Sequence, residues 1–396
     1  MTMSIKMATQ PPRGFPAEEF ETRCQALQQV MHQQQCDAIL LTTEPNVRYY
    51  SGFFTQFWQS PTRPWFLLVP LEGKPVAVIP EIGASGMAQT WVEDIRTWAS
   101  PQPDDDGISL LLGAIKSLPA KYGRLGMTLG AESMLRMPAN NFKLLRSGLG
   151  QTEIIDIAVP IHQLRMVKSD LEIAKTRHIC SIASQTFEAM ISIAAAGKSE
   201  REICKAMQLD LLARGADTCG YMVAGSGQGG YDSIIMGPTD RVLQTGDVLI
   251  IDTGSTWDGY FCDFDRNWAF GSADAASRSA YEVVWQATEA GFAAARPGAT
   301  TSDIWSAMND VMIAGGSLGN EVGRLGHGLG IELTERPSNT STDGTRLLQG
   351  MVLTLEPGMT YAAGKQMVHE ENIVITGEGA EWLTTRAAPE LPIINS

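Results

Sequence analysis

Two segments in the C-terminal half of the chain place acidic side chains inside strands that are otherwise apolar. The first, GDVLIIDTGSTWDGYFCDFDRNWAFG, covers residues 246–271, and the second, MVLTLEPGMTYAAGKQMVHEENIVIT, covers 351–376. Each holds two apolar stretches separated by turn-forming residues, which predicts an antiparallel hairpin. A buried carboxylate is costly unless it is paired or bound to a metal ion. These segments therefore constrain both the fold and the chemistry.

The first hairpin brings two aspartates together if its loop is centred between Trp257 and Asp258. A four-residue loop at this point would place Asp252 directly opposite Asp263, with the two Cβ atoms roughly 4.5–5.5 Å apart. Carboxylates at this distance repel each other unless positive charge lies between them. Two divalent metal ions about 3.5–4 Å apart would supply that charge.

The second hairpin repeats this arrangement with glutamates. A loop centred on Ala363 would place Glu356 opposite Glu370. The register is an assumption, and a slip by one residue would present His369 or Glu371 instead, because successive side chains point to opposite faces. A second pair of opposed carboxylates would complete the acidic part of a metal centre.

A histidine between glycines supplies the remaining ligand. His327 lies in RLGHGLGIE, where glycines permit close backbone approach to a ligand and the imidazole offers one neutral metal ligand. The predicted metal ligands are Asp252, Asp263, His327, Glu356 and Glu370, whose negative charges two divalent ions would balance. Oxygen-rich ligation favours Mn²⁺, Fe²⁺ or Co²⁺ over zinc. Taken singly, each residue is more often an ordinary turn or loop residue, so the prediction rests on their combination.

The order of apolar stretches predicts two domains, residues 1–160 and 161–396. In the first, short strands alternate with helices, which is typical of an α/β domain. A helix is expected from Ala17, and EPN at 44–46 is interpreted as a turn. In the second, one long helical stretch over 164–197 precedes a helix capped by Ser199. Hairpins and helices around 275–297 and 302–316 follow, which indicates an α+β domain.

Composition narrows the classes of function. Thirty Lys and Arg against 44 Asp and Glu give a net charge of −14, and the absence of a basic cluster argues against a nucleic-acid partner or an anionic membrane. The sequence has no signal-peptide pattern and no run of about 18 apolar residues, so a cytoplasmic location is expected. The six cysteines lack C-x-x-C spacing and are expected to be reduced and mostly buried.

The predicted ligands resemble the pattern of the pita-bread metallohydrolases, which include methionine aminopeptidase, aminopeptidase P, prolidase and creatinase. That pattern has two aspartates, the second in a D-x-T-R-like string, then a histidine in G-H-G-x-G, a glutamate before Pro-Gly and a final glutamate before an apolar strand. The matching strings here are DFDR, GHGLG, LEPG and HEENIVIT. The resemblance covers about residues 160–390. The N-terminal half is similar, more weakly, to the creatinase-type N-domain.

The resemblance implies a mechanism and an assembly. A hydroxide that bridges two metal ions would attack a carbonyl or amidine carbon. Glu356 matches the position of the family's proposed general base and proton shuttle. A homodimer and a small-molecule or dipeptide substrate are also implied.

Several departures from the family pattern concern the substrate. Family peptidases carry a histidine where this chain has Ile235, three residues before the proline of SIIMGPTDR, and another where it has Thr334. One such donor can be worth ~10²–10³ in rate, which places ordinary Xaa-Pro peptidase activity in doubt. Asp265 replaces the threonine of D-x-T-R and would either add a carboxylate to the site or pair with Arg266. Tyr231 is a further candidate substrate contact.

An aromatic-rich segment, SGFFTQFWQSPTRPWF, lies at residues 51–66. One interpretation is a core strand with its flanks. The other is a loop that reaches the active site of a dimer partner, as in creatinase-like enzymes. Trp58 and Arg63 would then contact the substrate, and an aromatic wall would suit a small cation.

The leading functional interpretation is a dinuclear metal-dependent hydrolase of a C–N bond in a small molecule or Xaa-Pro-type dipeptide. One alternative is a creatinase-like or ectoine-hydrolase-like enzyme on the same scaffold. Another is a lyase similar to the dimethylsulfoniopropionate lyases, although those carry an aspartate where this chain has Gly254. A different class is an inactive pita-bread binding module, for which an acidic chain would suit a basic partner.

Overall fold

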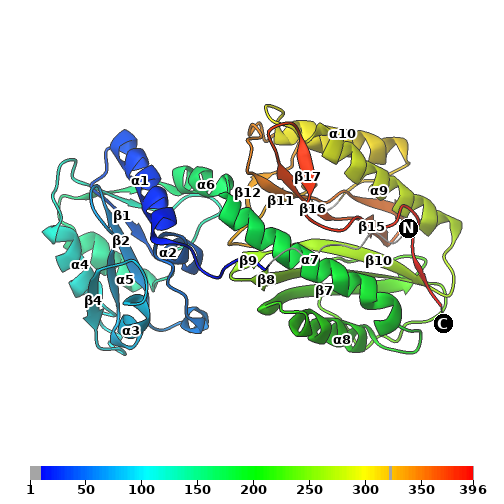
Figure 1. Ribbon diagram of the computed structural model, residues 1–396, viewed down its shortest axis with the longest axis horizontal. Coiled ribbons are helices and arrows are strands. Elements are labelled where there is room, and N and C mark those ends of the chain that lie inside the picture. Colours follow the sequence, from blue (N-terminus) through cyan, green and yellow to red (C-terminus); the bar gives the residue numbers. More distant parts are fainter. Residues whose placement is uncertain (1–9, 321–322, 396) are drawn as a thin grey trace. The chain divides into compact units, whose positions relative to one another are not determined.

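The structure is a computed structural model that describes residues 10–320 and 323–395. It divides into two compact units, one over Pro12–Arg165 and one whose main part begins at Met166 (Figure 1). This division falls a few residues after the boundary of 160 expected from the sequence. None of the described helices is long and apolar enough to cross a membrane.

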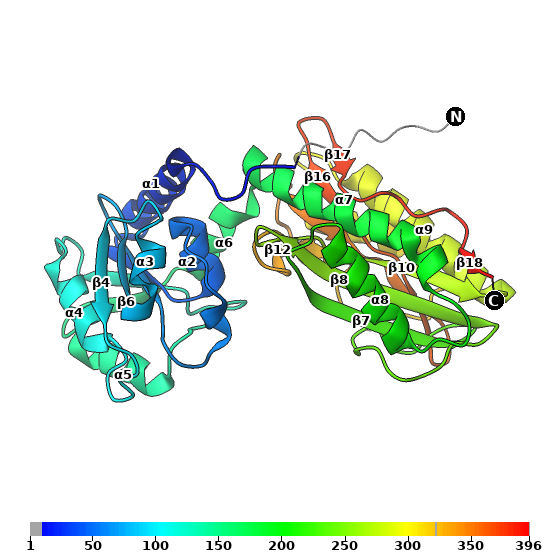
Figure 2. The same cartoon turned by 60° about the horizontal axis from the view of Figure 1, so that its bottom comes forward.

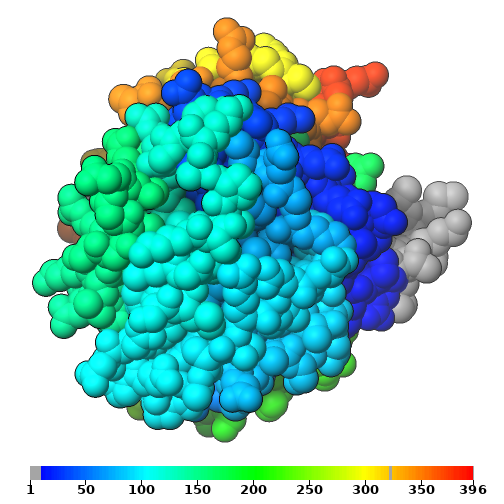
Figure 3. Space-filling view, turned by 90° about the vertical axis from the view of Figure 1, so that its left-hand side faces the viewer, coloured from blue at the N-terminus to red at the C-terminus, as the bar shows by residue number. Residues whose placement is uncertain are grey.

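The N-terminal unit is built on one mixed six-stranded sheet in the order β4-β3-β2-β1-β5-β6. Its strands are β1 (Ala38–Leu41), β2 (Phe66–Pro70), β3 (Val76–Pro80), β4 (Asp94–Trp98), β5 (Arg124–Met127) and β6 (Glu153–Asp156). Its helices are α1 (Ala17–Gln34), α2 (Glu44–Ser51), α3 (Ala84–Met87), α4 (Ile108–Ser117), α5 (Ala139–Gly148) and α6 (Ala158–Met166), with 3₁₀ turns η1 (Gln56–Gln59) and η2 (Glu81–Gly83). Figure 3 shows the surface of this unit, formed mainly by the segments coloured blue to cyan. The predicted α/β character is confirmed.

Two helix boundaries differ from the prediction. The EPN segment, interpreted as a turn, opens α2, because Pro45 stands in the first turn, where its missing backbone N–H costs nothing. The single helix predicted over 164–197 is interrupted. Helix α6 ends at Met166, and the next helix begins at Asp170, where Ser169 and Glu172 form a reciprocal capping box.

The C-terminal unit contains two larger sheets, ordered β18-β10-β8-β7 and β12-β11-β13-β16-β17. The strands are β7 (Thr218–Gln228), β8 (Asp247–Trp257), β9 (Tyr260–Phe261), β10 (Phe264–Phe270), β11 (His327–Gly328), β12 (Glu335–Ser338), β13 (Val352–Leu355), β14 (Gly358–Ala362), β15 (Lys365–Val368), β16 (Glu371–Ile375), β17 (Ala380–Trp382) and β18 (Ile393–Ile394). The helices are α7 (Asp170–Ile193), α8 (Glu200–Ala213), α9 (Ala275–Ala294) and α10 (Thr301–Ala314). The predicted cap of α8 at Ser199 is confirmed. Helices and hairpins in one unit also confirm the α+β prediction.

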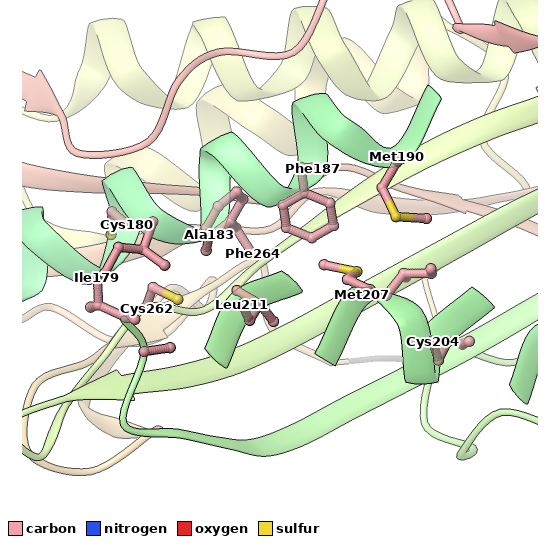
Figure 4. Close-up of a cluster of buried hydrophobic side chains, with 14 of the residues drawn as sticks. Ile179, Cys180, Ala183, Phe187, Met190, Cys204, Met207, Leu211, Cys262 and Phe264 are labelled. Atoms are coloured by element: carbon pink, nitrogen blue, oxygen red, sulfur yellow. The ribbon is translucent and has the colours of Figure 1, made fainter. Parts of the chain in front are cut away.

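The helices of this unit lie in pairs against the strands. Helices α7 and α8 contact β8 and β7, while α9 contacts β13, β14 and β15 (Figures 1 and 2). Ile179 and Phe187 of α7, together with Met207 and Leu211 of α8, lie in one buried cluster with Phe264 of β10 (Figure 4). Each such side chain contributes about 1.5–3 kcal/mol when fully buried. All six cysteines are free and five are buried, as predicted.

Candidate metal centre

The first hairpin runs from β8 through β9 into β10, in a register that differs from the predicted one. Its turn is formed by Asp258 and Gly259, which both have positive φ, 47° and 77°. This two-residue turn places Asp252 opposite Asp265, so the predicted pairing of Asp252 with Asp263 is wrong. The register is displaced by two residues, and Asp263 stays on the same face because side chains alternate with a period of two.

The second hairpin has the register expected from the sequence. Strand β13 pairs with β16, and β14 pairs with β15, in a single register that is continuous between the two pairs of strands. Glu356 and Glu370 lie between these paired strands. The continued register therefore sets the two glutamates opposite each other.

Side chains from both sheets meet near His327. One ligand atom from each of Asp263, His327 and Glu370 lies within 4.8 Å of the other two, and His327 Nε2 is 3.4 Å from Asp263 Oδ2. These three side chains are buried. Asp252 and Glu356 are partly exposed, and repulsion links their carboxylates to those of Asp263 and Glu370. The five predicted ligands therefore form one electrostatic cluster.

The backbone around His327 fixes the orientation of its ring. Its N–H donates to Thr354 Oγ1 at 3.1 Å, and Nδ1 lies 2.9 Å from the Gly328 carbonyl. If Nδ1–H donates to that carbonyl, the Nε2 lone pair is available to a metal ion. A Cβ on Gly326 (φ +122°) would lie 2.2 Å from the Thr354 carbonyl oxygen, and one on Gly328 would lie 2.3 Å from that of Arg336. The glycines therefore admit neighbouring backbone close to His327.

Among residues 10–320 and 323–395, no lysine or arginine forms an ion pair with the carboxylates of the cluster, and Arg324 lowers the pKa of Asp263 and Glu356 only by its charge. Asp252 Oδ1 and Glu370 Oε1 are buried atoms without a hydrogen-bond partner. Burial raises the pKa of Glu370 well above its usual range, and Asp263 and Glu356 raise it further. Burial also raises the pKa of Asp263 to about 8 and that of Glu356 to about 7. Unpaired, oxygen-rich and repelling donors of this kind fit a pair of divalent cations.

Two further polar residues hold the aspartates in place. Tyr221 Oη donates to Asp252 Oδ2 at 3.0 Å. The side chain of Asn372 donates to the Asp263 carbonyl and accepts from the Asp263 N–H, the latter at 2.9 Å. The sequence analysis missed both residues. Asn372 follows Glu370 by two residues and so shares its strand face, a signal that could have pointed to it.

Glu371, next to Glu370 in the sequence, serves a different purpose. Its carboxylate accepts hydrogen bonds from Arg266 at 3.0 Å and Arg386 at 2.9 Å. Burial alone would raise the pKa of Glu371, but Arg266, His369 and Arg386 outweigh it and hold this pKa well below its usual range. The one-residue slip considered from the sequence, which would present Glu371 or His369, does not occur.

The candidate substrate contacts of this unit have different environments. Ile235 is 77% exposed and Thr334 is also exposed, so both are accessible, but neither offers an imidazole. Tyr231 is only 2% exposed. Its hydroxyl donates to Asn267 Oδ1 at 2.8 Å and accepts from a backbone N–H of β15 at 2.9 Å. We therefore correct the prediction for Tyr231, which is a core residue with an occupied hydroxyl.

The aromatic segment of the N-terminal unit is a loop organised around Arg136. The Arg136 guanidinium donates to the carbonyl oxygens of Phe57, Trp58, Ser60, Thr62 and Arg63. Trp58 is 6% exposed and packs on Trp65, with ring centroids 6.0 Å apart. Within this unit Trp58 is thus a core residue, whereas Arg63 is partly exposed and has a φ of 61°.

Comparisons with known proteins agree with this architecture. The sequence matches the model of metallopeptidase family M24 over residues 174–378 and that of the creatinase/prolidase N-terminal domain over residues 23–167. An uncharacterized peptidase of Staphylococcus saprophyticus is 29% identical over 356 residues, which cover 89% of this chain and 95% of that protein. The probable dipeptidase PepE of Mycobacterium tuberculosis is 26% identical over 334 residues, which cover 83% and 85%.

Solved structures of the same fold cover nearly the whole chain. The dipeptidase PepE from Mycobacterium ulcerans matches with a TM-score of 0.83 and 26% identity, over 97% of this chain and 100% of that one. A prolidase from Thermococcus sibiricus matches with a TM-score of 0.84 over 95% and 99%, and at 23% identity this likeness shows the fold alone.

A two-sheet catalytic domain with this buried acidic cluster, preceded by a creatinase-type domain, defines a pita-bread metallohydrolase. The chain belongs to metallopeptidase family M24 and is a metal-dependent hydrolase. The resemblance drawn from the five ligand positions is confirmed.

Proposed function

We propose that this chain hydrolyses a C–N bond in a small molecule or an Xaa-Pro-type dipeptide, with two divalent metal ions as cofactors. The observation that carries the proposal is the meeting of Asp263, His327 and Glu370, with two buried carboxylate oxygens left unpaired. The carboxylates of Asp252 and Glu356 interact electrostatically with this group. The residues that would hold the ions are Asp252, Asp263, His327, Glu356 and Glu370.

Glu356 is the residue to which we assign the proton transfer. Bound divalent ions would polarise the scissile group and lower the pKa of a water molecule. Glu356 is partly exposed, and burial of its carboxylate raises its pKa to about 7. This pKa describes the metal-free site, and bound ions would displace the proton. The assignment therefore rests on the position that Glu356 shares with the family's proposed general base and proton shuttle.

The residues at Ile235 and Thr334 favour a small non-peptide substrate within this proposal. Neither can supply the imidazole donors that the resemblance to family peptidases implies, and a buried donor can be worth ~10²–10³ in rate. The relatives named as dipeptidases favour a dipeptide instead. Creatine and cyclic amidines such as ectoine are small non-peptide molecules with C–N bonds, so they belong to the class that Ile235 and Thr334 favour.

A dimethylsulfoniopropionate lyase is less well supported by the surroundings of Gly254. A Cβ at this position would lie 2.3 Å from Leu333 Cδ1 and 3.4 Å from Tyr221 Cβ. The additional aspartate of those lyases would therefore need Leu333 to move away. An inactive binding module is also less well supported, because a module has no use for buried carboxylates without counter-charges.

A substrate screen of the full-length chain tests the proposal. Protein loaded in turn with Mn²⁺, Fe²⁺, Co²⁺ and Zn²⁺ is offered Xaa-Pro dipeptides, creatine, ectoine and dimethylsulfoniopropionate. We expect C–N hydrolysis of one class, lost on chelation and in Glu356→Gln, and retained in Glu378→Gln, which changes an exposed glutamate. Cleavage of dimethylsulfoniopropionate alone would establish the lyase, and failure to retain any metal would favour the module.

Three finer points belong to the same proposal. We propose Mn²⁺, Fe²⁺ or Co²⁺ in preference to Zn²⁺, because oxygen donors outnumber nitrogen donors and no thiolate is among them. We also propose a homodimer in the cytoplasm. Sedimentation analysis and elemental analysis of protein purified from its native host test the assembly and the metal.

A further inference from the structure

Asp265 is a carboxylate of the site that the five ligand positions do not include. It lies on β10 directly opposite Asp252 of β8, and it is 1% exposed. It follows Asp263, which lies between β9 and β10, by two residues. Directly opposite side chains of a ladder lie on one face, so Asp265 shares the face of the sheet that carries Asp252.

No cationic side chain among the described residues lies within ion-pair distance of the Asp265 carboxylate. The guanidinium of Arg266 instead donates to the backbone carbonyls of Asp265 and Glu370 and to the carboxylate of Glu371. The Asp265 side chain accepts from Asn267 Nδ2 at 3.4 Å, while the same nitrogen donates to a backbone carbonyl at 2.7 Å. A long bond to a shared neutral amide does not compensate a buried charge.

The electrostatics of Asp265 follow from these surroundings. The Asp265 side chain is buried and lies on the same face of the ladder as that of Asp252. Asp252 itself has a buried oxygen, Oδ1, without a hydrogen-bond partner. Two such side chains repel each other when both are ionised, and a cation bound between them would remove this repulsion.

We propose that Asp265 is a sixth protein ligand of the metal centre, which offers a carboxylate oxygen to the ion held by Asp252 and Asp263. This inference rests on the proposed dinuclear centre. The threonine of the D-x-T-R pattern supplies a neutral hydroxyl at this position, whereas Asp265 supplies an anionic oxygen. The ligand set thereby becomes harder and favours oxygen-preferring ions such as Mn²⁺ over Zn²⁺.

Metal titration of two substitutions tests this assignment without an activity assay. Asp265→Asn keeps the side-chain shape, and Asp265→Thr installs the residue of the family pattern. Asp247→Asn is the matched control, since Asp247 is a fully buried carboxylate of β8 that pairs with Arg241 at 2.7 Å, outside the metal centre. Binding of Mn²⁺ and Zn²⁺ is measured by calorimetry, metal per chain by elemental analysis, and folding by thermal unfolding of each apo protein.

The expected result is a rise in the Mn²⁺ dissociation constant of about 10-fold or more in both Asp265 variants. Zn²⁺ binding should change less, and the metal affinities of the folded control should match those of the wild-type chain. The absorption of Co²⁺-loaded protein should also change, because it reports coordination number. Unchanged Mn²⁺ affinity in a folded Asp265→Thr variant would overturn the inference and leave the proposed function intact. A wild-type chain that binds no divalent ion would overturn both.

Discussion

Glu370 and Glu371 are adjacent buried glutamates with opposite electrostatics. Burial and four neighbouring acidic residues raise the pKa of Glu370, whereas Arg266 and Arg386 hold the pKa of Glu371 well below its usual range. The alternation of a strand sends one side chain to the metal centre and the other to the arginines. We therefore expect glutamine at position 371 to reduce the stability of the fold, and glutamine at position 370 to reduce metal binding.

For Glu371→Gln we expect a large loss of stability. Removal of one partner from a buried ion pair costs about 3–5 kcal/mol, because the remaining charge stays buried and uncompensated. Arg266 has a side-chain exposure of only 9%, so water cannot replace the carboxylate. Urea unfolding of the apo protein measures the effect, and a loss below about 1 kcal/mol would contradict the role given to this pair.

For Glu370→Gln we expect no loss of stability but a loss of metal binding. The substitution removes an unbalanced charge from a site where Oε1 has no partner, so the apo protein should be at least as stable as the wild-type chain. Metal per chain should fall, and hydrolysis should fall by about 10²-fold or more, since metal ligation is lost. Elemental analysis after dialysis provides the measurement. Full metal retention would show that Glu370 is not a ligand.

The candidate metal ligands could be predicted from the sequence, but the residues that hydrogen-bond to them could not. Asp252, His327 and Glu370 were identified because an acidic or imidazole side chain in an apolar or glycine-rich string is unusual and has few inexpensive explanations. Tyr221 and Asn372 lie in ordinary strands. Their role depends on contacts with residues 31 and 109 positions away, which a local pattern does not encode.

The type of turn that joins two strands decides their register. It explains why the predicted pairing of Asp252 with Asp263 is wrong. The turn of the first hairpin is an Asp-Gly pair, the strongest short-range signal for a two-residue turn. The prediction instead assumed a four-residue loop. The resulting displacement by two residues kept Asp263 on the correct face. It also hid the fact that Asp265 is the true partner of Asp252.

The strand β11 should depend on Gly326 for its position. With φ at +122° and a Cβ only 2.2 Å from the Thr354 carbonyl oxygen, Gly326→Ala must displace the backbone next to His327. We expect a loss of about 1–3 kcal/mol in stability together with weaker metal binding. Gly379→Ala is the control, because a Cβ there meets nothing within 4 Å. Equal unfolding midpoints and metal affinities for the two variants would contradict the role of Gly326 in positioning the backbone next to His327.

Fold class was predictable for the whole molecule because the alternation of strands and helices changes character between the two units. The helix boundaries were less so. Pro45 looked like a turn residue but opens α2, and the apolar periodicity ran through the break before Ser169, where a capping box starts α7. In both places the deciding factor is how the first turn of a helix satisfies its backbone N–H groups.

The stability of the whole chain should depend on pH in opposite ways with and without metal. In the apo protein, burial raises the pKa of Asp263 to about 8 and of Glu356 to about 7, against about 3.9 and 4.3 in an unfolded chain. The folded state then binds more protons than the unfolded state, so the free energy of unfolding falls as pH rises through these values. Burial lowers the pKa of His327 and His369, which acts in the other direction, but only below about pH 6.5.

Between about pH 6.5 and 8.5, the change of stability with pH therefore reports the carboxylates and not the two histidines. Over this range the melting temperature of the chelated protein should fall, by roughly 2–4 °C for each kcal/mol lost. The Mn²⁺-loaded protein should not show this fall, because metal binding releases the protons and tightens as pH rises. Thermal unfolding in the presence of chelator or of Mn²⁺ provides both curves. Parallel curves would mean that the acidic cluster does not exchange its protons for metal ions, and the dinuclear centre would lose its electrostatic basis.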